Sequence, residues 1–339
     1  MAEISLGLLA GAGSWFALRS HTSRQFIRDR CLRLLVPLVV GFMLFSPTQA
    51  YVEALTHGRF DGSFFQYVPS FFAHLQPSWH LWWIGAYAYH LWFLAFLLLS
   101  TLIALPLFLW FRGAAGQRFV EHLSAWCAHS WGIWLFVVPI AAIQLTLRAA
   151  FPLYTDWADF LYCFAFFVFG YLLFSKPSFT EAIRRQGRIA LSLGIACFLL
   201  IGVSYFAGYL TSWEASPSYS PGYLLYQLLR SINTWAWLVF VLACGMRYLN
   251  ANNRVLRYAN EAVLPFFVLQ QPAIIGVAFY VVQWNLGVLT KWLLISTLSL
   301  ALTLALYELL IRRINAVRRL FGMKPRHRPL RGPVKGAVV

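Results

Sequence analysis

The sequence predicts an all-α protein built as a polytopic transmembrane helix bundle, and its composition and the length of its apolar segments carry this prediction. Of the 339 residues, 60% are hydrophobic and 11% are charged, whereas an ordinary soluble domain carries about 25% charged residues. Disorder is excluded as well, because it requires few hydrophobic residues and here the aromatic residues alone make up 18%. The apolar runs are continuous rather than alternating, so they predict helices and not the strands of a barrel.

Segments long enough to cross a membrane follow one another along the chain. A helix needs about 20 mostly apolar residues to cross the hydrocarbon core, and polar or Pro-bearing connections separate the segments. A short first segment covers 4–18, and longer ones are expected at 34–55, 90–111, 131–150, 158–175, 189–211, 223–247, 261–282 and 291–311. We therefore expect about nine spans in one membrane domain, residues 1–325, followed by a basic cytoplasmic tail, residues 326–339.

Lys and Arg gather in alternate connections between these segments. Of the 27 basic residues, 23 lie in 19–33, 112–130, 176–188, 247–260 and 312–339. Cytoplasmic loops are enriched in Lys and Arg, so these connections and the C-terminus are expected inside the cell. The same bias accounts for the net charge of +16 without nucleic acid, for which no recognition motif is present. With nine spans the chain would start outside on a short segment without a signal peptide, so we expect it to be clipped at its start.

One histidine is the leading candidate for catalysis. His90 opens a predicted span in the block His90-Leu91-Trp92-Phe93-Leu94, where an imidazole facing a wet cavity can act as a general base near neutral pH. The alternative is an interfacial histidine in an aromatic belt. The five cysteines form no CxxC pair, and no histidine lies at metal-ligand spacing, so neither a metal site nor a disulfide framework is predicted.

Two arginines are candidates for binding an anionic donor. Arg30 and Arg33 lie one helical turn apart on one predicted face, and two guanidinium forks suit the phosphates of a nucleotide-type donor. The alternative is a plain topology anchor that binds lipid head groups.

Two further groups of polar and aromatic residues are candidates for binding. Arg230 and Glu308 lie inside predicted spans, where an ionisable group is expensive and requires a partner or a polar cavity. The stretch 56–89 is rich in aromatic residues, whose flat faces stack on sugar rings while His and Tyr tips bond hydroxyls. Trp79, His80 and Trp82 are therefore possible acceptor contacts, with an aromatic belt at the interface as the alternative.

Four blocks together resemble the acyltransferase-three family of integral membrane acyltransferases. They are Gly11-Ala12-Gly13-Ser14-Trp15-Phe16-Ala17-Leu18, Arg30-Cys31-Leu32-Arg33-Leu34-Leu35-Val36-Pro37, His90-Leu91-Trp92-Phe93-Leu94 and Asn260-Glu261-Ala262-Val263-Leu264-Pro265-Phe266-Phe267-Val268-Leu269-Gln270-Gln271-Pro272. Within that family the chain is most similar to the glucan-succinylating branch, the glucans biosynthesis protein C type. The similarity runs from about residue 7 to Pro325.

The resemblance implies a ten-helix bundle in a bacterial inner membrane, with both ends cytoplasmic. It implies transfer of an acyl group from cytoplasmic acyl-CoA, the donor substrate, to a hydroxyl of a glycan on the outer side, with no bound cofactor. The expected partners are membrane lipid, acyl-CoA and the glycan acceptor; the oligomeric state is not predicted. Arg30 and Arg33 match the family's R-x-x-R motif, implicated in handling the donor, and His90 matches its H-L-W-F-L block.

Two departures from the family pattern bear on activity. The family's first helix, with an Arg and the His regarded as catalytic, has no counterpart in this chain. Gln270 stands where many relatives have His, and an amide does not shuttle protons near neutral pH. It therefore joins Arg230 and Glu308 as a possible intramembrane polar site without acid–base chemistry.

Three functions remain open at this point. The first is a membrane O-acyltransferase, inactive if the missing helix is essential. The second is a polytopic transporter or flippase for a polar solute, with Arg230 and Glu308 lining its pathway. The third is a catalytically inactive partner that scaffolds a glycan assembly complex.

Overall fold

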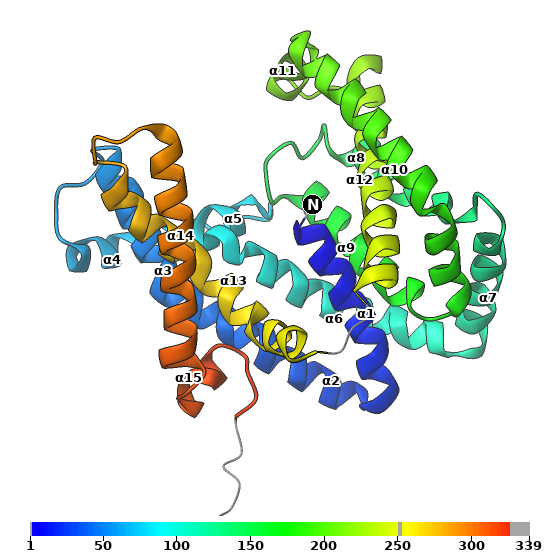
Figure 1. Cartoon of the computed structure of the whole chain (residues 1–339), viewed down its shortest axis with the longest axis horizontal. Coiled ribbons are helices and arrows are strands. Elements are labelled where there is room, and N and C mark those ends of the chain that lie inside the picture. Colours follow the sequence, from blue (N-terminus) through cyan, green and yellow to red (C-terminus); the bar gives the residue numbers. More distant parts are fainter. Residues whose placement is uncertain (1, 250–252, 326–339) are drawn as a thin grey trace, which may run out of the picture.

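The fold is a bundle of helices, as the composition predicts. The computed structural model describes residues 2–249 and 253–325, and these contain no β-strand (Figure 1). The α-helices and the short 3-10 and π turns, labelled η, are α1 (Ala2–Ser20), α2 (Ser23–Arg30), η1 (Cys31–Leu35), α3 (Val36–Thr56), α4 (Phe64–Ala73), α5 (Trp82–Ala88), η2 (Tyr89–Leu91), α6 (Trp92–Arg112), α7 (Ala114–Ala128), η3 (Gly132–Phe136), α8 (Val137–Leu147), α9 (Trp157–Leu173), α10 (Pro177–Phe206), α11 (Tyr209–Ala215), α12 (Pro221–Tyr248), α13 (Arg254–Val281), α14 (Val288–Leu306), η4 (Tyr307–Ile311) and α15 (Asn315–Leu320). The predicted tail, 326–339, lies outside the described residues.

Six helical segments of the described chain are long and apolar enough to cross a membrane. They are Ser23–Thr56, Trp82–Arg112, Pro177–Phe206, Pro221–Tyr248, Arg254–Val281 and Val288–Ile311. The predicted spans 131–150 and 158–175 correspond to shorter apolar helices, Gly132–Leu147 and Trp157–Leu173, and the predicted span 4–18 falls on α1, which is not among the six. A polytopic membrane protein is therefore confirmed, while the count of nine spans and the side of the C-terminus stay predictions.

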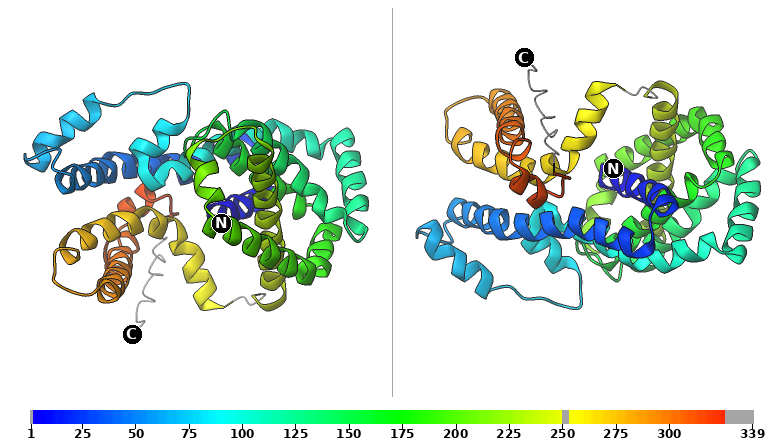
Figure 2. Two further views of the ribbon diagram at one scale, coloured as in Figure 1. Left: turned by 90° about the horizontal axis from the view of Figure 1, so that it is seen from above. Right: turned by 90° about the horizontal axis from the view of Figure 1, so that it is seen from below.

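The buried side chains form two large cores that meet along α6. The first core collects residues of α1, α7, α8, α9, α10 and α12 around the later half of α6, including Leu105 and Phe108. The second core collects residues of η1, α13, η4 and α5 around the beginning of α6, including Leu91 and Leu94. Seen along the bundle, the corresponding groups of helices lie side by side (Figure 2). A smaller cluster of Trp92, Phe93, Phe96 and Phe160 lies between α6 and α9.

Glycines allow α1 and α9 to touch through their backbones. A Cβ at Gly11 would lie 1.9 Å from the carbonyl oxygen of Phe167, and one at Gly170 would lie 1.8 Å from that of Leu8. Neither position has room for a side chain. Gly7 and Gly11 also have the small-x-x-x-small spacing that brings membrane helices close together. The first glycine of the Gly11-Ala12-Gly13-Ser14 block is thus explained by helix packing.

The aromatic-rich stretch 56–89 folds into α4 and α5 rather than remaining an extended loop. Around Tyr51, near the end of α3, the rings of Phe60, Phe64 and Tyr67 pack with centroids 5.6–6.2 Å from its own. Such tilted and edge-to-face contacts stabilise a compact aromatic cap at one end of the bundle.

Candidate active site

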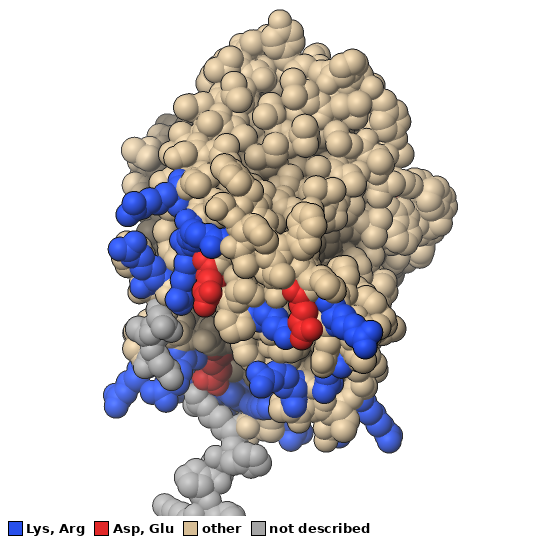
Figure 3. Space-filling model, turned by 90° about the vertical axis from the view of Figure 1, so that its right-hand side faces the viewer, with Lys and Arg blue, Asp and Glu red and all other residues tan. Residues whose placement is uncertain are grey.

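Charged side chains gather at one end of the molecule. Figure 3 shows Lys and Arg over the lower half of one face, together with its acidic residues, whereas the upper half of that face carries none. The basic connections predicted to share one side include α2, the start of α7 and the start of α10, and the side chains of Lys176 and Glu121 join α10 to α7 at 3.3 Å. We call this region the basic end.

Arg30 is held against the N-terminal helix at the basic end. Its Nη2 donates a hydrogen bond to the Ser14 hydroxyl at 3.1 Å, and its guanidinium carbon lies 5.2 Å from the centre of the Phe26 ring. A Cβ at Gly13 would lie 3.7 Å from the same Nη2, so the small residue leaves the arginine room. The Gly11-Ala12-Gly13-Ser14 block therefore packs α1 on α9 and also positions Arg30.

Arg33 has different surroundings from Arg30. A π turn, Cys31–Leu35, includes it and changes the helical spacing that predicted a shared face; π turns are frequent at functional sites. The Arg33 side chain is exposed and has no hydrogen bond or ion pair within the described residues. One arginine is thus fixed inside the protein and the other is available to a ligand.

Ion pairs order the C-terminal part of the basic end. The buried Arg318 guanidinium lies 2.8 Å from a Glu261 carboxylate oxygen, and Arg312 Nη1 donates to both carboxylate oxygens of Glu308 at 2.8 Å. Beside them, a Cβ at Gly322 would meet the Arg33 carbonyl oxygen at 2.5 Å. The residues after α15 therefore pack directly against the π turn.

His90 joins the H-L-W-F-L block to the proline of the last block. Pro272 lies inside α13 and has no N–H, so the carbonyl of Val268, four residues earlier, loses its helical partner. His90 Nε2 lies 3.1 Å from that carbonyl oxygen and must be the protonated nitrogen, because a carbonyl only accepts. The other nitrogen, Nδ1, is buried and has no partner. In this geometry His90 stabilises the interruption of α13.

A polar cavity of about 350 Å³ opens between α3, α4 and α5. Its polar lining comes from Glu53, Arg59, Tyr67, Ser70, His74, Tyr87 and Tyr89, and its apolar lining from Ala50, Ala54, Phe71 and Ala86. Its volume lies in the range of small-molecule sites, about 300–1,000 Å³. We call it the α3–α5 pocket.

The Glu53 carboxylate is the centre of charge in the α3–α5 pocket. It accepts hydrogen bonds from Arg59 Nη2 at 2.7 Å and from the Tyr89 hydroxyl at 3.1 Å. Burial, and next to it the charge of Glu53, raises the pKa of Tyr67 above its usual value, so this phenol stays protonated. The φ of Tyr89 is 50°, a conformation that costs a non-glycine residue about 1–3 kcal/mol and is found mostly at functional sites.

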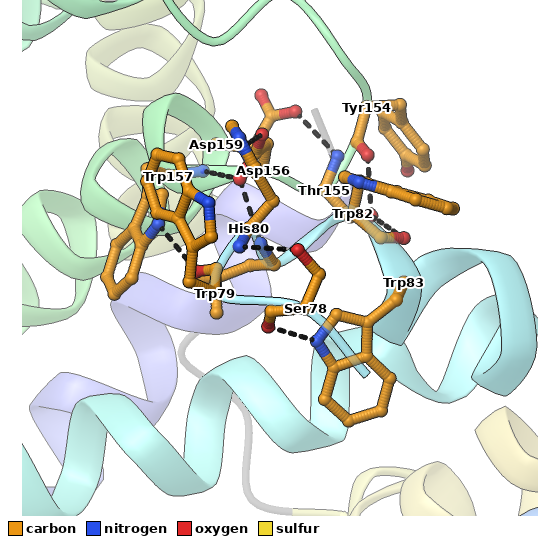
Figure 4. A network of polar contacts seen from close by, with 11 residues as sticks. Ser78, Trp79, His80, Trp82, Trp83, Tyr154, Thr155, Asp156, Trp157 and Asp159 are labelled. Carbon is orange, nitrogen blue, oxygen red and sulfur yellow. Dashed lines mark hydrogen bonds and ion pairs between the residues drawn. The ribbon is translucent and has the colours of Figure 1, made fainter. Parts of the chain in front are cut away.

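A second polar network joins the loop before α5 to the start of α9 (Figure 4). Asp156 is buried, its Oδ2 lies 2.7 Å from His80 Nδ1, and its Oδ1 accepts from the backbone N–H of Leu81 at 2.9 Å and of Trp157 at 2.8 Å. Trp79 and Trp82 take part through their carbonyls, which accept from Trp157 Nε1 at 3.1 Å and from the Thr155 hydroxyl at 3.3 Å. The predicted acceptor contacts thus belong to one network, outside the α3–α5 pocket.

Arg230, Gln270 and Glu308 do not form one site. Arg230 is an exposed residue of α12, which packs on α8 and α10, while Glu308 lies on η4, which packs on α13, α14 and α15. Gln270 has no side-chain hydrogen bond within the described residues. No shared polar pathway connects them.

Other charges predicted near span ends turn out to be paired. The guanidinium of Arg148 is buried and hydrogen-bonds to Asp159 and, at 3.0 Å, to Gln144. Snorkelling is therefore the wrong explanation for this pair, because the connection between α8 and α9 turns both side chains inward. No group of His, Cys, Asp or Glu in the described parts of the chain is arranged to hold a metal ion.

Sequence reasoning missed the α3–α5 pocket and the role of Asp156. One signal was readable: His80-Leu81-Trp82-Trp83-Ile84 repeats the pattern of His90-Leu91-Trp92-Phe93-Leu94 ten residues earlier. The partner of His80 lies 76 positions away, and no pattern in the chain indicates that distance.

Fold and site define the class of protein: a helical, multi-pass membrane protein with a basic end and a polar cavity fit for a small ligand. A family model described as an acyltransferase domain, acyltransferase 3, matches residues 4–308. The chain therefore belongs to the acyltransferase-three family, a family of membrane acyltransferases. No curated protein and no solved structure gives a significant match.

Proposed function

We propose that this protein transfers an acyl group from acyl-CoA, bound at the basic end, to a hydroxyl of a glycan bound in the α3–α5 pocket. Membership of the acyltransferase family supports the reaction class. The glucan-succinylating branch, which the motifs resemble, makes succinyl-CoA and a glucan the first substrates to try. We place the protein in the bacterial inner membrane, with the basic end in the cytoplasm, because basic connections favour that side.

One observation carries this proposal: the arginine pair and the pocket lie at opposite ends of one helical segment. Arg33 is in η1 and Glu53 is near the end of α3, and the two helices are continuous in the chain. At about 1.5 Å of rise per residue, the residues between them span about 30 Å, which equals the thickness of the hydrocarbon core. A donor on one face and an acceptor on the other can therefore both contact the same protein.

The donor end supplies two different guanidinium groups. Arg33 is exposed and unpaired within the described residues, so it can form the charge-assisted hydrogen bonds that phosphates accept. Arg30 is fixed by Ser14 and adds positive charge beside it. The α3–α5 pocket offers a carboxylate, phenols and an imidazole, groups that bond sugar hydroxyls, beside the aromatic ring of Phe71.

The test is acyl transfer in vesicles that contain the purified protein. Release of free CoA from succinyl-CoA should require a gluco-oligosaccharide on the side opposite the donor, and the acyl group should be recovered on the sugar. Replacing both Arg30 and Arg33 by Ala should raise the KM for succinyl-CoA about tenfold or more.

The matched control replaces Arg24 and Arg28, exposed arginines of the same helix, by Ala. It should leave the donor KM close to that of the wild type. An unchanged donor KM in the Arg30 and Arg33 double variant would remove the donor-binding role. Glycan-independent movement of a solute, without CoA release, would favour the transporter instead.

A further inference from the structure

We propose that His80 and Asp156 form the general base of the transfer reaction, with His80 Nε2 taking the proton of the acceptor hydroxyl. This inference rests on the proposed function and assigns its proton acceptor. The expectation from the sequence alone is His90, and the structure gives the two histidines opposite surroundings.

Asp156 fixes the proton on His80. The carboxylate is 1% exposed and accepts from the backbone N–H groups of Leu81 and Trp157 through Oδ1. Hydrogen bonds of this kind favour the ionised carboxylate. An ionised carboxylate only accepts, so the His80 Nδ1 that lies 2.7 Å from its Oδ2 carries the proton. The lone pair of the ring is therefore on Nε2.

His80 Nε2 is open to a substrate. The side chain is 31% exposed, and the described residues give Nε2 no hydrogen-bond partner. The ring of Trp79, 69% exposed, lies with its centroid 3.7 Å from that of His80. A flat aromatic face beside an accessible base is suited to hold a pyranose ring, with one hydroxyl at the imidazole nitrogen. In Figure 4 the indole of Trp79 lies beside the His80 imidazole.

The backbone next to Asp156 is strained in a way that fits a functional site. Thr155 has φ 64° and is fully buried; a β-branched residue in this region is a genuine outlier. Its N–H donates to Asp159 Oδ2 at 2.9 Å, and its hydroxyl approaches α5, where a Cβ at Gly85 would lie 2.2 Å from it. The surrounding contacts thus hold Asp156 under the loop that carries His80.

His90, in the second H-L-W block, lacks these properties. Its Nε2 is occupied by the Val268 carbonyl, and its Nδ1 is buried without a partner. Neither nitrogen can accept a proton from a glycan without a change in α13. The repeated pattern therefore produces one open imidazole oriented by a carboxylate and one imidazole used for packing.

The reaction step balances with the acyl thioester as the second substrate. The hydroxyl proton moves to His80 Nε2 while the hydroxyl oxygen forms a C–O bond with the thioester carbonyl carbon. The C–S bond then breaks, CoA leaves as the thiolate, and the imidazolium returns its proton to that thiolate. The ionised Asp156 stabilises the imidazolium between the two proton transfers.

The experiment compares conservative variants in the vesicle assay. His80→Gln and Asp156→Asn should each lower kcat by about 10²- to 10⁴-fold, with a smaller change in the KM for the gluco-oligosaccharide. Asp156→Asn keeps an oxygen for Leu81 and Trp157, but its NH₂ turned toward Nδ1 would place the ring proton on Nε2. A lost base then results from the wrong tautomer rather than from unfolding, which a matching thermal unfolding midpoint would verify.

Two readouts separate catalysis from support of the fold. In the wild type kcat/KM should fall at acidic pH as His80 becomes protonated, and this acid limb should vanish in His80→Gln. Imidazole added to His80→Ala should restore part of the rate. The matched control is His129→Gln, an exposed histidine at the end of α7, which should keep the wild-type rate. Wild-type rates in both His80→Gln and Asp156→Asn would overturn the inference, as would an unchanged acid limb.

A measurement without turnover distinguishes failure of this inference from failure of the proposed function. Diethyl pyrocarbonate should modify His80 at Nε2, and millimolar gluco-oligosaccharide should slow that modification severalfold, as read by mass spectrometry. Absence of acyl transfer in the wild type would defeat the proposed function alone. Modification of His80 that is equally fast with and without the sugar would defeat the site itself.

Discussion

Replacing Gly11 by Ala tests the backbone contact between α1 and α9. The new Cβ would lie 1.9 Å from the Phe167 carbonyl oxygen, so α1 must move away by about 1.5 Å to reach ordinary contact at 3.4 Å. Overpacking of this kind costs about 1–3 kcal/mol, of which the better helix propensity of Ala offsets up to about 1 kcal/mol. The same movement should separate Ser14, one turn further along α1, from Arg30.

The assay combines thermal unfolding in detergent with the donor KM. Gly11→Ala should lower the unfolding midpoint by about 2–8 °C and raise the donor KM, as Ser14→Ala should do without the loss of stability. Gly202→Ala is the matched control, because a Cβ at that helical position meets nothing within 4 Å; it should keep or raise the midpoint. A Gly11→Ala protein as stable as the wild type, with its donor KM unchanged, would refute the reasoning.

Three further predictions concern single contacts. Asp159→Asn, which leaves the buried guanidinium of Arg148 without its counter-charge, should cost about 3–5 kcal/mol and lower the unfolding midpoint; an unchanged midpoint would contradict a buried pair. Pro272→Ala supplies an N–H for the freed carbonyl, so His90→Ala should cost about 1 kcal/mol less in that background, as a double-mutant cycle of unfolding free energies would show; simple additivity would disprove the link. Glu53→Gln should raise the KM for the gluco-oligosaccharide about tenfold with little change in kcat, and an unaltered KM would exclude the α3–α5 pocket as the acceptor site.

The features that the sequence predicted are those that depend on local composition. Continuous apolar runs indicate helices wherever they pack, and alternate basic connections do reach a common end of the bundle. Glycine at position 11 was visible as part of a motif, but its reason lies in a carbonyl of Phe167, which no local pattern indicates. Local patterns therefore predict the elements and not the contacts between them.

The candidate site was less predictable, because its contacts join distant parts of the chain. The Arg30 and Arg33 spacing predicted one face, yet a π turn begins between them and gives each a different environment. The Asp156 carboxylate read as an ordinary loop residue until the fold brought it to His80. Proline at position 272 was visible in the block, but its effect on His90 required the geometry of α13.

The two cores have a common boundary, and both chemically important contacts lie at it. Arg30 is placed between Phe26 of the first core and Leu34 of the second. His80 comes from the loop that enters α5, beside the second core, whereas Asp156 begins α9, whose residues fill the first. Any rotation of one half of the protein against the other would disconnect the donor arginine and the proton acceptor in the same movement. Substrate entry by such an opening would therefore switch off both until the halves close again, which would protect the thioester from water while the acceptor is absent.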